Sequence, residues 1–131
     1  MKSIHVAGKR KRAIARATLS EGHGKVKINQ TPIEFYTPML YRMKIMEPLQ
    51  LAGDSAYGID IDVKVMGGGM NSQAEAARLA IARALSRHDK KLEKIFLKYD
   101  RQLLVADVRR KEPRKPNRHG KARAKVQKSY R

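Results

Sequence analysis

The chain has 131 residues, with 30 Lys and Arg against 12 Asp and Glu, which gives a formal net charge of +18 at pH 7. This excess predicts a phosphate-rich partner; an acidic membrane surface fits less well, because the basic end lacks the Trp, Phe and Leu stripe of an interfacial helix. The absence of cysteine excludes disulfides, thiolate zinc sites and a cysteine nucleophile. No apolar run approaches the roughly 18 residues that span a bilayer, and none follows Met1-Lys2-Ser3, so we expect a soluble protein without a secretory signal.

Positive charge is concentrated at the C-terminal end. Residues 109–131 contain eleven Lys and Arg but one acid, Glu112, together with Pro113, Pro116 and Gly120. Such a segment buries too little apolar surface to offset its conformational entropy, so we expect it to be disordered until it meets a polyanion. The sequence therefore predicts one globular domain over residues 1–108 and an extended basic tail over residues 109–131.

Three short strands are predicted near the start of the chain, at Ile4 to Ala7, Ala13 to Leu19 and Lys25 to Ile28. The last two flank residues 21–24, whose glycines suit a tight hairpin. We therefore expect an antiparallel meander.

The next segment predicts short helices. Thr31 before Pro32 is typical of an N-cap followed by proline at the first helical position, so a short helix should follow the turn at 29–32. Apolar residues recur at helical spacing over 39–51, but Pro48 should interrupt that pattern. Two short helices or one kinked helix are expected there.

Residues 57–65 alternate between apolar and polar side chains, which predicts a half-buried strand. After three glycines, Ser72 and Glu75 have capping-box spacing and predict the start of a helix. Its apolar face is expected to comprise Ala77, Ile81, Ala84, Leu85 and His88, with Arg78, Arg83 and Arg87 opposite and Leu79 fitting neither side. A further helix over Lys91 to Tyr99 and a last strand over Leu103 to Val108 complete the prediction.

The triple glycine, Gly67 to Gly69, lies between a predicted strand and a predicted helix. Backbone N–H groups and a helix N-terminus at such a place can receive a phosphate. Tight-turn geometry alone explains the glycines equally well. A nucleotide site has little support, because neither the phosphate-binding-loop motif nor the dinucleotide-binding motif is complete.

No catalytic or metal-binding constellation stands out. Asp60 and Asp62 share one face of a strand and could hold Mg²⁺, but a solvated polar face explains them better. The four histidines have no metal-ligand spacing, and no serine lies in a nucleophile elbow. We predict no cofactor, no metal and no enzymatic activity.

A second basic cluster, residues 8–12, lies between two predicted strands, and Arg16, Lys25 and Lys27 extend its charge along neighbouring strands. Together with the tail it predicts a continuous surface that faces phosphates. Because aromatic residues are sparse, there is no evident platform for stacking single-stranded bases. Recognition of backbone and shape is expected, which suits folded RNA.

Three segments resemble one known family. Residues 67–85, which read GGGMNSQAEAARLAIARAL, resemble the signature of small-subunit ribosomal protein nine, and residues 8–16 resemble the opening strand motif of that family. The ending Gln127-Lys128-Ser129-Tyr130-Arg131 is similar to that of archaeal and eukaryotic members. Bacterial members tend to end Ser-Lys-Arg, so Tyr130 departs from them, and contacts of their penultimate lysine are not carried over.

The resemblance implies a two-layer α+β domain with a mixed sheet of about four strands, helices packed on it and a left-handed βαβ crossover. It also implies a non-catalytic structural constituent of the head of the small subunit in the cytoplasmic ribosome. The expected partners are small-subunit ribosomal RNA, neighbouring ribosomal proteins of the head and, at the end of the tail, the peptidyl-site transfer RNA, with no membrane.

The predicted transfer-RNA contacts are Lys128, Ser129 and Arg131. The predicted ribosomal-RNA contacts are Lys9, Arg10, Lys11, Arg12, Arg16, Gly67, Gly68, Gly69, Arg109, Arg110, Lys111, Arg114, Lys115, Arg118, Lys121, Arg123, Lys125 and Gln127. Two alternatives stay open at this point: an RNA-processing enzyme that uses Asp60 and Asp62, and a DNA-compacting protein suggested only by net charge.

Overall fold

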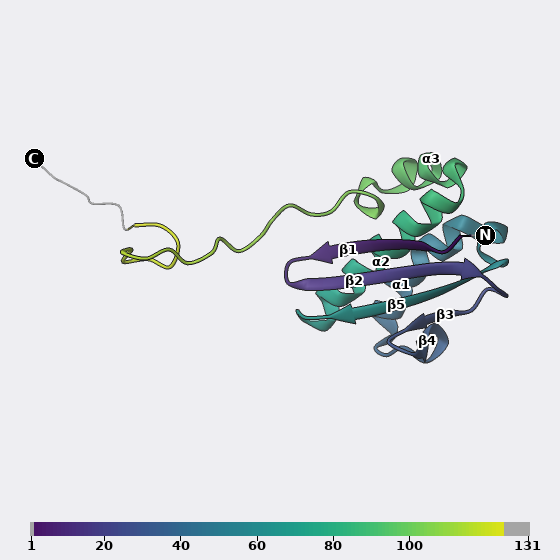
Figure 1. Ribbon diagram of the computed structural model, residues 1–131, viewed down its shortest axis with the longest axis horizontal. Helices are drawn as coiled ribbons and strands as arrows, with labels where there is room; N and C mark the ends of the chain where they lie inside the picture. Colours follow the sequence, from purple (N-terminus) through teal and green to yellow (C-terminus); the bar gives the residue numbers. More distant parts are fainter. Residues whose placement is uncertain (1, 125–131) are drawn as a thin grey trace, which may run out of the picture.

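The chain folds into one mixed sheet covered by helices on a single face (Figure 1). The structure is a computed structural model and describes residues 2–124. The strands are β1 (Ile4–Arg10), β2 (Ala13–Glu21), β3 (Val26–Ile28), β4 (Thr31–Pro32) and β5 (Ile59–Met66). The helices are α1 (Met39–Ala52), α2 (Met70–His88) and α3 (Lys90–Tyr99), with 3-10 turns η1 (Ile33–Phe35), η2 (Gly53–Ala56) and η3 (Arg101–Leu103). The predicted α+β class is confirmed, and no helix within residues 2–124 is long and apolar enough to cross a membrane.

The strands lie in the order β1-β2-β5-β3-β4. β3 and β5 are parallel, and the other neighbours are antiparallel. The predicted hairpin between residues 13–19 and 25–28 is wrong, because β5 lies between β2 and β3. β5 pairs with eight successive residues of β2, so the longer, non-local ladder prevails over the local turn signal at 21–24.

The parallel pair is connected through α1. In Figure 1 both strands point to the left, the chain moves upward from β3 to β5, and α1 lies behind the sheet. This is a left-handed βαβ crossover, as the resemblance implies, and it is opposite to the usual hand of such connections.

Each edge strand of the sheet is joined to its neighbour by a tight hairpin. β1 and β2 are joined at residues 11–12, where Lys11 has a φ of 53°. β3 and β4 are joined by Asn29 and Gln30, both at positive φ, as a type I′ hairpin turn requires. Thr31 therefore belongs to a strand and is not an N-cap, and the short helix that follows Pro32 is the 3-10 turn η1.

α2 is the central helix of the molecule. Nine of its residues are buried, because the sheet covers one side while α1, α3 and η3 contact others. Leu79, which fitted neither predicted face, is buried, whereas His88 is exposed and its predicted place on the apolar face is wrong. The predicted capping box is also wrong: α2 begins at Met70 after Gly69, without a side-chain cap.

Gly8 sets how closely α2 approaches the sheet. A Cβ atom at this position would lie 2.5 Å from the carbonyl oxygen of Ala76 and 2.7 Å from the backbone nitrogen of Ala80. Both neighbours are backbone atoms of an alanine-rich helix, so neither can move aside alone. The glycine and the alanines together permit close helix-to-strand packing.

Of the two alternatives predicted for residues 39–51, the pair of short helices is wrong, because α1 continues through the buried Pro48 as a single helix. The predicted strand over 103–108 is absent: η3 ends at Leu103 and the chain continues without regular structure. Arg83 donates hydrogen bonds both to the Ala7 carbonyl of edge strand β1, at 3.0 Å, and to the Leu104 carbonyl, at 3.1 Å. A side chain, and not a main-chain ladder, therefore links residue 104 to this edge of the sheet.

Substitution of Gly8 by alanine is expected to lower the free energy of unfolding by about 1–3 kcal/mol, because the added methyl group overpacks the contact with α2. The measurement is urea unfolding followed by circular dichroism. Gly58→Ala is the matched control, since a Cβ there meets nothing within 4 Å. Equal stability of the two variants would contradict the proposed role of this contact.

Candidate nucleic-acid interface

Three segments that are far apart in the sequence meet at one end of the sheet. They are the β1–β2 turn, the loop between β5 and α2, and the first residues of the tail. Together they line an open cleft of about 680 Å³. Its lining residues are Lys11, Arg12, Gly68, Gly69, Ser72, Arg109, Arg110, Lys111, Glu112, Pro113 and Arg114. Eight of these eleven residues were predicted as RNA contacts, and Ser72, Glu112 and Pro113 were not.

The glycine loop has two kinds of glycine. Gly67 and Gly68 have φ values of 74° and 67°, and a Cβ at Gly67 would lie 2.8 Å from the carbonyl oxygen of Arg12. Turn geometry and close approach to the β1–β2 turn therefore explain these two residues. A Cβ at Gly69 would meet nothing within 4 Å, so protein packing does not require glycine there.

The N-terminus of α2 opens into this cleft. No side chain caps it, and its first turn contains no acidic residue. The helix dipole places partial positive charge at this end, which adds to the charges of Lys11 and Arg12 on the adjacent turn. The combined electrostatic effect favours an anion such as a phosphate over a cation.

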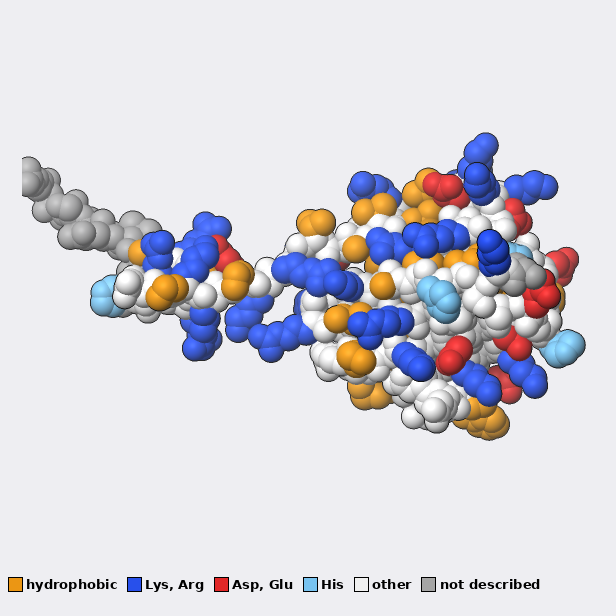
Figure 2. All heavy atoms as spheres, viewed as in Figure 1, with side chains coloured by type: hydrophobic (Ala, Val, Ile, Leu, Met, Phe, Trp, Pro, Cys, Tyr) orange, Lys and Arg blue, Asp and Glu red, His pale blue; other side chains and the backbone are white. Residues whose placement is uncertain are grey.

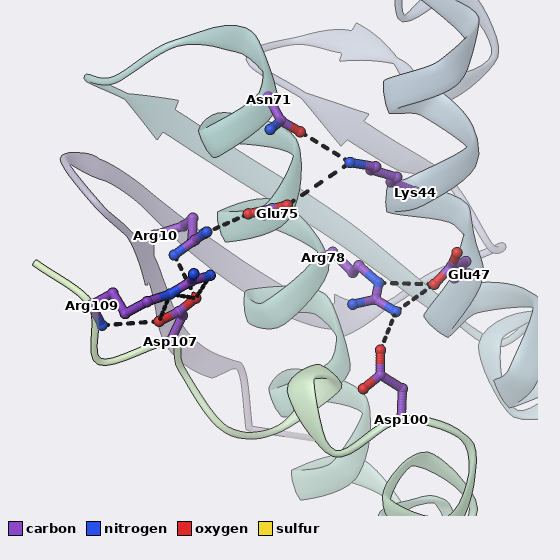
Figure 3. A network of polar contacts seen from close by, with 9 residues as sticks. All are labelled: Arg10, Lys44, Glu47, Asn71, Glu75, Arg78, Asp100, Asp107 and Arg109. Carbon is purple, nitrogen blue, oxygen red and sulfur yellow. Dashed lines mark hydrogen bonds and ion pairs between the residues drawn. The ribbon is translucent and has the colours of Figure 1, made fainter.

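The tail root, residues 107–110, is attached to the domain (Figure 3). Arg110 donates a hydrogen bond from Nη1 to the Lys11 carbonyl at 2.7 Å. The Asp107 carboxylate accepts hydrogen bonds from the Arg109 side chain, at 2.7 to 3.1 Å, and from the Arg109 backbone N–H, at 2.9 Å. These bonds and the nearby Arg10 charge hold the pKa of Asp107 well below its usual range.

Arg10 is occupied by protein groups. Its Nε donates to Glu75 of α2 at 2.6 Å, and its Nη1 lies 2.6 Å from Oδ2 of Asp107. Its side chain is 16% exposed. By contrast Lys9, Lys11 and Arg12 are exposed, so the four predicted cations of this cluster differ in accessibility.

A second positive area lies on the uncovered face of the sheet. Arg16 of β2 is the register partner of Lys64 of β5, and both side chains are exposed. Neither makes a hydrogen bond or ion pair within residues 2–124. Since like charges placed opposite each other repel, this pair favours an external anion. Lys64 was not predicted as a contact; only the strand register brings it beside Arg16.

The remainder of the tail extends away from the domain without helix or strand up to residue 124 (Figure 1). Figure 2 shows Lys and Arg side chains along it and where it leaves the domain. Glu112 pairs with Lys115 at 2.7 Å and with Arg123 at 2.9 Å, and these hydrogen bonds lower the pKa of Glu112. The other predicted contacts of this part, Arg114, Arg118 and Lys121, are exposed.

Lys125, Gln127, Lys128, Ser129 and Arg131 lie outside the described residues. Their predicted contacts with ribosomal RNA and transfer RNA therefore stay predictions.

Asp60 has a structural role in the loop between β2 and β3. Its Oδ1 accepts the backbone N–H groups of His23 and Lys25, each at 2.9 Å. Hydrogen bonding by Lys25 and His23 lowers the pKa of Asp60. No group of three His, Cys, Asp or Glu suited to a metal ion occurs within residues 2–124. Asp60 and Asp62 therefore do not belong to an assembled metal site within residues 2–124.

Arg78 forms a second ion-pair cluster next to the tail root (Figure 3). It donates to Glu47 of α1 from Nε, at 2.9 Å, and from Nη2, and to Asp100 at 3.1 Å from Nη2. Burial alone would lower the pKa of Arg78, but the two carboxylates outweigh it and raise it. The cluster ties α1, α2 and the start of η3 together.

The fold and the surface define a small, basic α+β domain with a positively charged cleft and an extended basic tail. The family model described as Ribosomal protein S9/S16 matches residues 8–131. "Small ribosomal subunit protein uS9" of Methanococcus vannielii is 52% identical over 134 aligned positions that cover both chains completely, and the protein of the same name from Methanococcus maripaludis strain C7 is 51% identical with the same coverage. The chain belongs to the ribosomal protein S9/S16 family.

The family assignment confirms the resemblance that the sequence motifs indicated, and the Methanococcus relatives agree with the archaeal-type ending. The family consists of ribosomal proteins and not of enzymes, so the RNA-processing alternative is set aside.

Because its pKa is lowered, Asp60 stabilises the loop at pH values above the pKa it has in the unfolded chain. This contribution should be lost as pH falls through the pKa of the folded state. We expect the Asp60 carboxyl to titrate below 3.8 in carbon-detected NMR, and the His23 and Lys25 amides to lose hydrogen-exchange protection over the same range. Asp60→Ala should remove that protection at neutral pH. A titration midpoint at or above 3.8 would contradict the assigned hydrogen bonds.

Proposed function

We propose that this protein is a structural constituent of the small ribosomal subunit, in its head, within the ribosome of the cytoplasm. Family membership along nearly the whole chain supports this assignment. In this role the protein binds ribosomal RNA, neighbours other ribosomal proteins of the head and catalyses no reaction.

One observation carries the RNA-binding part of the proposal: segments predicted independently as phosphate contacts converge on one cleft. The β1–β2 turn, the uncapped N-terminus of α2 and the tail root each contribute positive charge, and no acid of α2's first turn opposes them. Nucleic-acid backbones are bound by such arrangements of cations and helix N-termini.

The exposed cations Lys9, Lys11 and Arg12 are proposed as contacts with the ribosomal-RNA backbone. Arg16 and Lys64 extend the same interaction to the uncovered face of the sheet. Along the tail the proposed contacts are Arg109, Arg110, Lys111, Arg114, Lys115, Arg118, Lys121, Arg123, Lys125 and Gln127. The RNA backbone is proposed to approach the main chain closely at three glycines, Gly67, Gly68 and Gly69. Among them, Gly69 is the one where a side chain would meet no other protein atom within 4 Å.

At the end of the tail, Lys128, Ser129 and Arg131 are proposed to contact the peptidyl-site transfer RNA. The support is the matched ending of the chain and the course of the tail, which leads away from the domain (Figure 1). Arg131 offers a guanidinium fork suited to a phosphate.

Replacement of Lys11 and Arg12 together by glutamine is expected to weaken binding to small-subunit ribosomal RNA. Each lost phosphate contact should lower the slope of log affinity against log salt by about 0.7 to 0.9. The measurement is a salt series of binding isotherms. Lys90→Gln with Lys94→Gln, on exposed α3 positions outside the cleft, removes the same charge and is the control. Equal effects of the two double variants would mean that net charge, and not this site, determines binding.

Deletion of residues 128–131 should leave the folding of the globular domain unchanged, because α2 and the sheet form the core without them. Transfer RNA in the peptidyl site should dissociate faster, by about tenfold, the equivalent of one charge-assisted hydrogen bond. The measurement is the dissociation rate from small subunits that contain the shortened protein, with tail-intact subunits in parallel. An unchanged rate would count against transfer-RNA contact.

A further inference from the structure

Asp107 lies where the chain leaves the globular domain. Its carboxylate is 2.6 Å from Nη1 of Arg10 and 2.7 Å from Nη2 of Arg109 (Figure 3). The Asp107 side chain is 17% exposed, whereas that of Arg109 is 77% exposed. The Asp107 carboxylate is therefore packed against the domain, whereas most of the Arg109 side chain is exposed to solvent.

Arg10 connects this acid to the core. It extends from the end of β1, donates to Glu75 of α2 from Nε and faces Asp107 with Nη1. That Nη1 atom is buried and has no partner in hydrogen-bond geometry among the described residues, so the Asp107 carboxylate acts as its counter-ion. A guanidinium that bridges two carboxylates in this way is unavailable to an RNA phosphate.

A second attachment lies three residues further along the tail. Arg110 reaches back to the Lys11 carbonyl, in the turn that directly follows Arg10. The tail root is thus fixed both to the end of β1 and to the β1–β2 turn. Beyond this point the tail is held by contacts within itself up to residue 124, among them the ion pairs of Glu112 with Lys115 and Arg123.

We propose that Arg10 and Asp107 form a clamp that fixes the direction in which the basic tail leaves the domain. Both are positioning residues: Arg10 acts on the tail through Asp107 and not on RNA directly. An acid at the base of a cationic tail opposes polyanion binding by charge alone. Its benefit is that a pre-ordered root loses less conformational entropy when the tail binds.

The predicted effect of the clamp on RNA affinity rests on the proposed function. The clamp and simple charge attraction predict changes in affinity of opposite direction. Asp107→Asn adds one positive charge, so simple attraction predicts tighter binding to small-subunit ribosomal RNA. The clamp predicts binding weaker by about tenfold, because the freed root must be ordered on binding. Asp54→Asn makes the same charge change at an exposed acid that forms no hydrogen bond or ion pair through its side chain within residues 2–124. It should bind as well as the parent protein or slightly better.

Arg10→Lys supplies the second comparison. It keeps the charge but loses the planar fork that reaches two carboxylates, so the clamp predicts a loss similar to that of Asp107→Asn. Arg101→Lys, at an exposed position that is assigned no RNA contact, should stay within about twofold of the parent protein. Retained affinity in Arg10→Lys would indicate that Arg10 serves as a simple charge and would overturn the clamp.

A measurement on the free protein separates the clamp from RNA binding. In ¹⁵N relaxation experiments, the amides of residues 107–111 should gain fast motion in Asp107→Asn and Arg10→Lys but not in Asp54→Asn. Circular dichroism should show the same helix and strand content in all variants. If these amides are equally rigid in every variant, the clamp is wrong; if the parent protein fails to bind small-subunit RNA, the proposed function is wrong and the relaxation result still decides the clamp.

Discussion

The close packing of α2 on β1 and β2 is the contact on which the rest of the molecule depends. Gly8 has no side chain where the backbone of Ala76 and Ala80 approaches, and α2 presents small residues along most of its length. A helix held this close to a strand places its N-terminus beside the β1–β2 turn and its arginines over the free edge of β1. Since larger side chains on either element would separate them, the geometry of the cleft and of the edge follows from this packing.

The basic residues divide into two groups with different physical roles. Arg10, Arg78 and Arg83 are directed at carboxylates or backbone carbonyls of the protein, and they add polar links between its elements. Lys11, Arg12 and Arg16 are exposed, and their side chains make no hydrogen bond or ion pair within residues 2–124. The basic residues behind the net charge of +18 therefore do not all serve one purpose. Some stabilise the fold, and others are exposed and can bind a polyanion.

The structural arginines also explain how the open sheet is protected. β1 is an edge strand, and its His5 and Ala7 carbonyls accept hydrogen bonds from Arg87 and Arg83 of α2. These bonds blunt an edge that could otherwise pair with another chain. Arg83 also donates a hydrogen bond to the Leu104 carbonyl, so it holds the segment that leads to the tail beside the same edge.

The sequence determined the local features of this protein: strands at 4–7, 13–19 and 57–65, helices over most of 72–88 and 91–99, the basic tail and the family motifs. These features depend on alternation, helical periodicity and composition, which act between near neighbours. Tertiary structure alone decided the insertion of β5 between β2 and β3, the loss of the strand at 103–108 and the occupation of Arg10 by Glu75 and Asp107. Each of these involves partners separated by tens of residues. Their energies depend on which long-range pairing buries the most apolar surface and leaves the fewest polar groups without a hydrogen bond. A local sequence pattern does not show which pairing that is.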